Sequence, residues 1–129
     1  MKPPPEKIIS DEEIEEIRNL TSCSRQVART LKVLQNEDRL LILCILMQEG
    51  EMSVSSIGQK LGIAQPSLSQ QLTVLRNNKM VGTRRDGKSI YYFIDNQKAR
   101  DLMHSLQNVF GHEAPENSEE TEQLTNVIT

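Results

Sequence analysis

Short polar side chains fill most of the segment from residue 65 to residue 71, and their chemistry suits contact with DNA bases. They are Gln65, Ser67, Ser69, Gln70 and Gln71. A glutamine carboxamide can form two hydrogen bonds with adenine, and a serine hydroxyl can pair with several base edges. These residues are therefore the candidate DNA-contacting side chains, provided that a helix presents them to a major groove.

A second segment gathers cations around a tight turn. Arg84, Arg85 and Lys88 lie close together in the chain, and such side chains neutralise phosphates with an affinity that falls as salt rises. Arg76 and Lys79 are weaker candidates for the same role. A solvated turn without a partner is the alternative interpretation of this cluster.

The charges of the chain are segregated, although its formal net charge is only -3. Residues 58–100 hold eight basic and two acidic side chains, whereas residues 101–129 hold six acidic and no basic ones. A local basic excess inside an acidic protein is typical of a surface that binds a polyanion. The net charge therefore does not exclude a nucleic-acid partner.

Apolar periodicity and capping signals predict five helices that position these groups. We expect the first three helices over about 11–35, 37–49 and 54–61, with Ser10, Asn36 and Ser53 as their N-caps. The fourth should begin at residue 65, and the last should follow the N-cap Asp95 and end at residue 110. The short third helix, a glycine turn and the fourth helix, whose inner face carries apolar residues, have the sequence outline of a helix-turn-helix.

Two strand-like runs follow the fourth helix, over 81–85 and 88–94. Asp86-Gly87 separates them and is the pair that best supports a two-residue hairpin turn. The sequence therefore predicts a hairpin with a basic tip. Helices in this order with such a hairpin indicate a winged helix-turn-helix, a mainly α fold with five helices and a two-stranded wing.

The first and last helices carry apolar stripes that a chain this small cannot bury alone. The stripes are Ile14, Ile17, Leu20, Cys23, Val27, Leu31 and Leu34 in the first helix, and Ala99, Leu102, Leu106 and Val109 in the last. We expect a two-fold homodimer that is joined through these helices.

Over about residues 25–110 the chain resembles the ArsR family of bacterial winged-helix repressors. The resemblance lies in Asn36-Glu37-Asp38-Arg39-Leu40, Gln65-Pro66-Ser67-Leu68-Ser69-Gln70-Gln71-Leu72 and Thr83-Arg84-Arg85-Asp86-Gly87-Lys88-Ser89-Ile90-Tyr91-Tyr92. Within the family, the chain is most similar to the BigR/SqrR/NolR-like branch, which includes persulfide sensors. This resemblance implies a homodimer on a palindromic double-stranded DNA operator.

The resemblance also raises the question of what the protein senses. Cys44 matches the first cysteine of the persulfide-sensing branch, but Gly111 stands at the place of the second, so Cys23 is the only partner left for a redox response. Free cysteines as small apolar residues are the alternative interpretation. Ser53 and Ser55 stand where the family's metal sensors carry thiolates, so we expect no metal and no cofactor.

Composition divides the chain into three parts: a flexible N-terminal segment over 1–9, a DNA-binding and dimerisation domain over 10–111, and an acidic tail over 112–129 that we expect to be disordered. The longest apolar run, Leu40 to Met47, has eight residues, too few to cross a membrane. We therefore expect a soluble, cytoplasmic protein.

Two other functional classes are alternatives to DNA binding. An enzyme is disfavoured because the sequence has no glycine-rich phosphate loop, no HExxH and no GxSxG. A winged-helix protein-interaction module is the second alternative, with the acidic ends as its functional surfaces. A repressor that binds DNA constitutively, without sensing an effector, also fits the sequence.

Overall fold

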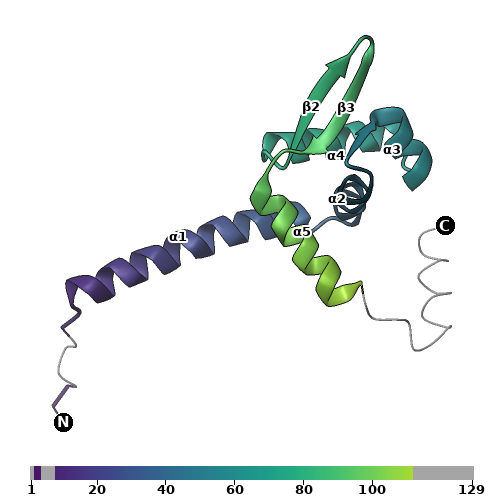
Figure 1. Cartoon of the computed structure of the whole chain (residues 1–129). Coiled ribbons are helices and arrows are strands. Elements are labelled where there is room, and N and C mark those ends of the chain that lie inside the picture. The colour runs from purple at the N-terminus through teal and green to yellow at the C-terminus, as the bar shows by residue number, and fades with distance from the viewer. Residues whose placement is uncertain (1, 4–7, 112–129) are drawn as a thin grey trace, which may run out of the picture.

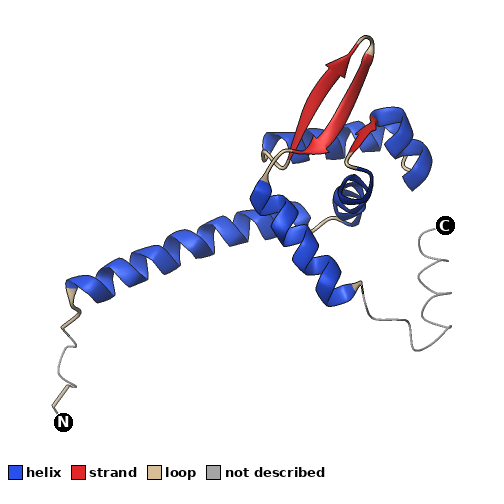
Figure 2. Cartoon of the chain, in the orientation of Figure 1, coloured by secondary structure: helices blue, strands red, loops and turns tan. Residues whose placement is uncertain are grey.

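The computed structural model describes residues 2–3 and 8–111. The predicted acidic tail at 112–129 and most of the predicted flexible start lie outside these residues. The described chain forms α1 (Asp11–Leu34), α2 (Glu37–Glu49), β1 (Glu51–Ser53), α3 (Val54–Leu61), α4 (Gln65–Asn77), β2 (Val81–Asp86), β3 (Ser89–Ile94) and α5 (Gln97–Phe110) (Figure 1). The five predicted helices and the hairpin are thus confirmed (Figure 2).

Helix α2 lies at the centre of the core. The Asn36 side chain accepts a hydrogen bond from the Arg39 N–H, and Gly50 ends the helix with a φ of +84°. The residues of its long apolar run are all buried or half-buried, and Ile42 and Leu43 are fully buried. An all-apolar helix can contact neighbours on every side, and α2 contacts every other helix and the sheet.

The helix-turn-helix forms as its residues predict. Ser53 caps α3, and Gly62 adopts a left-handed φ of +67° that lets the chain turn directly into α4. Pro66 lies in the first turn of α4, where the missing N–H breaks no helical bond. Leu68, Leu72 and Leu75 of α4 are buried.

The sheet has one strand more than predicted. The short β1 pairs antiparallel with β3, and the strand order is β1-β3-β2. The three residues of β1 are too few to show the alternating pattern of a strand, so the sequence alone did not predict it. They are extended because they pair with β3. The predicted two-stranded wing remains as the free ends of β2 and β3, which project from the body (Figure 1).

Two local predictions were wrong by one residue. Asp86 pairs with Ser89, so the hairpin loop is Gly87-Lys88 rather than Asp86-Gly87; Gly87, with φ +62°, takes the first loop position, where a positive φ is needed. Asn96, not Asp95, caps α5, because its side chain accepts from the N–H groups two and three residues ahead.

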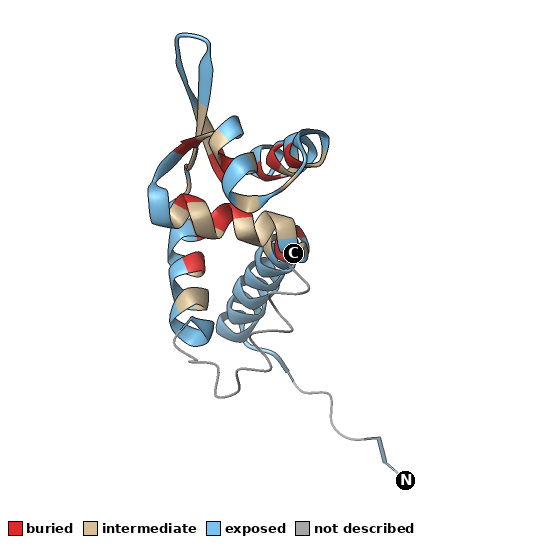
Figure 3. Ribbon diagram, turned by 90° about the vertical axis from the view of Figure 1, so that its right-hand side faces the viewer, coloured by how far each residue is buried: buried red, intermediate tan, exposed pale blue. Residues whose placement is uncertain are grey.

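Most of α1 projects away from the body. Only its last two residues, Val33 and Leu34, are buried. The rest of the helix is exposed except for the half-buried Thr30, and Figure 3 shows most of the helix as exposed. The described chain therefore covers the predicted apolar stripe only at its end, at Leu34, and leaves Ile14, Ile17, Leu20, Val27 and Leu31 exposed. Within the described residues, no helix is long and apolar enough to span a membrane.

Candidate nucleic-acid interface

The outer face of α4 presents the predicted polar side chains. Gln65, Ser69 and Gln70 are exposed, and Ser67 is half-buried at the flank of the helix. At 3.6 residues per turn, Gln70 lies opposite the buried leucine edge. The burial of one edge of α4 thus leaves amide and hydroxyl groups free on the other.

Gln71, which the sequence also predicts to contact bases, lies apart from this exposed face and is half-buried. Its Oε1 accepts a hydrogen bond from the Arg39 Nη1 at 2.8 Å, and the Arg39 Nε donates to the carbonyl oxygen of Val33. One half-buried arginine therefore ties α4 to the junction of α1 and α2. Gln71 positions the helix, and its carboxamide is engaged within the body.

Two further residues share the outer face with Gln70 but were not predicted. Both are exposed: Thr73 lies three residues after Gln70, and Asn77 lies four residues after Thr73. The Thr73 Oγ1 donates to the carbonyl oxygen of Ser69 at 2.8 Å, which fixes its position on the helix. The same helical periodicity that located the leucine edge could have located both.

The wing carries its predicted cations on opposite faces. Successive residues of a strand alternate between faces, so Arg85 lies on the same face of β2 as the buried Val81, the side packed against the helices. Arg84 lies on the other face. Arg85 and Lys88 are exposed at the end of the hairpin, and neither has an ion-pair partner among the described residues.

Arg84 is engaged within the sheet. Its Nε and Nη2 donate to the two carboxylate oxygens of Glu51 at 2.6 and 3.1 Å, and its guanidinium lies 5.0 Å from the centre of the Tyr91 ring. These hydrogen bonds hold the pKa of the Glu51 carboxyl below its ordinary value of 4.5, and they raise the pKa of Arg84. Sequence reasoning missed Glu51 because it missed β1.

The two weaker cations lie at the base of the wing. Arg76 is in the last turn of α4, and Lys79, with a left-handed φ of +59°, turns the chain from α4 toward β2. Both side chains are exposed. They extend the row of positive charge from α4 toward the hairpin.

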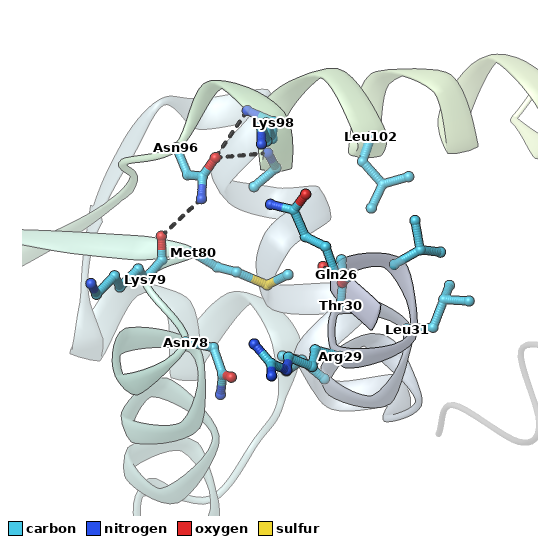
Figure 4. A pocket seen from close by; sticks show the side chains of 13 residues that line it. Gln26, Arg29, Thr30, Leu31, Asn78, Lys79, Met80, Asn96, Lys98 and Leu102 are labelled. Atoms are coloured by element: carbon cyan, nitrogen blue, oxygen red, sulfur yellow. Dashed lines mark hydrogen bonds between the residues drawn. The ribbon is translucent and has the colours of Figure 1, made fainter. Parts of the chain in front are cut away.

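A cavity of about 640 Å³ lies between α1, the turn after α4 and the start of α5 (Figure 4). Its lining includes Gln26, Arg29, Met80 and Lys98. It borders the exposed stripe of α1 through Leu31. The cavity thus borders the exposed α1–α5 surface and, through Lys79, the base of the wing.

The two cysteines are free thiols. Cys23 is exposed on α1, eleven residues before Leu34, which is about 16 Å along a helix axis at 1.5 Å per residue. Cys44 is half-buried in α2, and Figure 1 shows α1 running away from the body that holds α2. A bridge between them would require movement of α1.

The described residues contain no group of three histidine, cysteine or acidic side chains that could hold a metal ion. His104 lies on the exposed side of α5. His112 and Glu113, which are neighbours in the sequence, lie outside the described residues.

Comparison with known proteins agrees with this architecture. Residues 36–81 match the family model described as bacterial regulatory protein, arsR family. The chain is 45% identical over 87 residues to the biofilm growth-associated repressor of Xylella fastidiosa (strain Temecula1), a match that covers 67% of this chain and 75% of that protein.

Two solved structures show the same fold. The transcriptional repressor BigR from Xylella fastidiosa superposes with a TM-score of 0.66 at 42% identity, over 72% of this chain and 94% of that one. The homodimeric winged helix-turn-helix DNA-binding domain Mb0332 from Mycobacterium bovis gives a TM-score of 0.63 at 32% identity, over 75% and 89% of the two chains. The predicted fold class is confirmed.

The different environments of Gln70 and Gln71 predict different effects on stability. Gln71→Ala should lower the free energy of unfolding by about 1–2 kcal/mol, because Arg39 loses its acceptor on α4. Gln70→Ala, at an exposed position of the same helix, should change it by less than about 0.5 kcal/mol. Urea unfolding at one fixed protein concentration compares the two variants. Equal losses would contradict the assigned role of Gln71.

Proposed function

Since this chain belongs to the ArsR family of bacterial regulatory proteins, we propose that it is a transcriptional repressor that binds a palindromic operator as a homodimer. The family consists of DNA-binding regulators and not of enzymes. The single observation that carries the proposal is the exposed polar face of α4 beside the exposed Arg85 and Lys88 of the wing. Such a regulator would act in the cytoplasm, where bacterial genes lie.

We assign the two parts of this surface different roles. Gln65, Ser69 and Gln70 would contact base edges in the major groove, and a good contact discriminates between bases by about 1–3 kcal/mol. Ser67, at the flank of α4, would contact the edge of the groove. Arg85 would contact phosphate or the minor groove and add affinity with little base preference.

The remaining cations would extend the phosphate contacts beyond the groove. Lys88 lies in the hairpin loop, next to the wing strands, and Arg76 lies at the end of α4. Both are exposed. Phosphate contacts from the wing and from the end of α4 would fix the register of α4 on the duplex.

Dimer formation through α1 and α5 is supported by apolar surface that the monomer leaves open. Leu20 is 67% exposed on α1, and Phe110 is 65% exposed on α5. Burial of such side chains favours association, and BigR and Mb0332 show that this fold occurs in repressors and in homodimers. A two-fold pair would place its α4 helices about 34 Å apart, one turn of DNA.

A thiol response is a second candidate function, because Cys23 is exposed on the helix that would form the dimer. Linking Cys23 to another thiol would constrain α1 and alter the spacing of the two α4 helices. The test is a gel shift before and after treatment with an oxidant or polysulfide, with Cys23→Ser and Cys44→Ser as matched variants. Equal DNA affinity in both redox states would rule out this response and favour a constitutive repressor.

The wing assignment predicts a specific change in salt dependence. Arg85→Ala should reduce the slope of log K against log salt by about 0.9, the contribution of one phosphate contact. A fluorescence titration with a random-sequence duplex at several salt concentrations measures this slope. Lys98→Ala removes a positive charge from α5 and should leave the slope unchanged. Equal slopes for Arg85→Ala and wild type would contradict the assignment, and a protein-interaction module would show no salt-dependent binding at all.

A further inference from the structure

Glu51 and Arg84 meet across three strands on one face of the sheet. Arg84 pairs with Tyr91 of β3, and Glu51 pairs with Phe93 two residues further along the same strand. The Arg84 side chain crosses the Tyr91 ring to reach the carboxylate, to which it donates two hydrogen bonds. A two-point contact between a guanidinium and a carboxylate has the geometry that arginine also uses to bind phosphate.

Its ion pair with Glu51 distinguishes Arg84 from Arg85 and Lys88, the other two cations of the wing. The fork of its guanidinium is occupied by Glu51, and Asp86 lies 3.9 Å from its Nη1. Arg85 and Lys88 have no ion-pair partner in the described part of the chain. The Glu51 carboxyl is charged at neutral pH, as any ordinary glutamate is, and the hydrogen bonds from Arg84 lower its pKa further.

We propose that Glu51 is an intramolecular competitor for DNA phosphate, which withholds Arg84 from the duplex and so lowers the affinity of the wing for DNA. A phosphate can bind the Arg84 fork only if it displaces the carboxylate. The side chains of Arg84 and Glu51 are 50% and 36% exposed, so solvent and phosphate can reach the pair. This inference rests on the proposed DNA-binding function and assigns a role to Glu51 within it.

The salt dependence of binding can detect this competition. Each phosphate that a protein cation neutralises adds about 0.9 to the slope of log K against log salt. With Arg84 withheld, the wild-type slope lacks its contribution. Loss of the Glu51 carboxylate should therefore steepen the slope. A conformational change that adds no phosphate contact should leave the slope unchanged.

The experiment is a fluorescence titration of the full chain with a random-sequence duplex at salt concentrations from 50 to 200 mM. Glu51→Gln should bind more tightly than wild type, with a slope steeper by about 0.9. Its advantage should therefore shrink by about 3.5-fold across this fourfold range of salt. Arg84→Ala alone should leave the wild-type slope unchanged, in contrast to Arg85→Ala.

Two further variants separate competition from a general charge effect. Glu49→Gln is the matched control. Glu49 lies two residues before Glu51, is exposed, and forms an ion pair with Lys60. It should not steepen the slope. The effect of Glu51→Gln should also disappear when Arg84→Ala is present, since the carboxylate acts only through that arginine. Circular dichroism confirms that each variant is folded.

The outcomes are distinct. If Glu49→Gln increases the affinity for DNA as much as Glu51→Gln does, or if the increase persists when Arg84→Ala is present, the inference is overturned. The increase would then come from the loss of a negative charge in general. Weaker binding by Glu51→Gln would also overturn it, because Glu51 would then position Arg84 for DNA. If neither wild type nor any variant shows salt-dependent binding, the proposed function itself fails.

Discussion

The exposed polar face of α4 depends on the burial of its opposite edge against the core. Leu68, Leu72 and Leu75 are each at most 1% exposed, and together they bind α4 to a body built around α2. An amphipathic helix held in this way cannot rotate without exposing leucine. The helix positions that carry carboxamides and hydroxyls on the other face are therefore fixed without a ligand, which would reduce the ordering cost of binding.

A second constraint comes from α1, whose apolar stripe the chain does not cover. The monomer leaves Ile17, Val27 and Leu31 about half exposed, although burial of such side chains is favourable. A second copy that covers the stripe would also determine the distance between two α4 helices. One apolar surface would thus provide both stability and the geometry of a two-fold DNA site.

Local signals in the sequence were sufficient to predict most of the fold and to place polar side chains on the exposed face of α4. Asn36 and Gly62 act within one helical turn, so capping and glycine conformation predicted their elements. The roles of Gln71 and Arg84 depend instead on Arg39 and Glu51, which lie 32 and 33 residues away in the chain. Spacing within one segment cannot show such contacts, because tertiary packing brings the partners together.

In the proposed homodimer, two α4 helices held one DNA turn apart would present their polar faces to one duplex. Selection of bound sequences from a random duplex pool tests this most directly. We expect the selected sequences to share an inverted repeat whose half-site centres lie about 10–10.5 base pairs apart. Enrichment of a single half-site, or of no sequence at all, would contradict it.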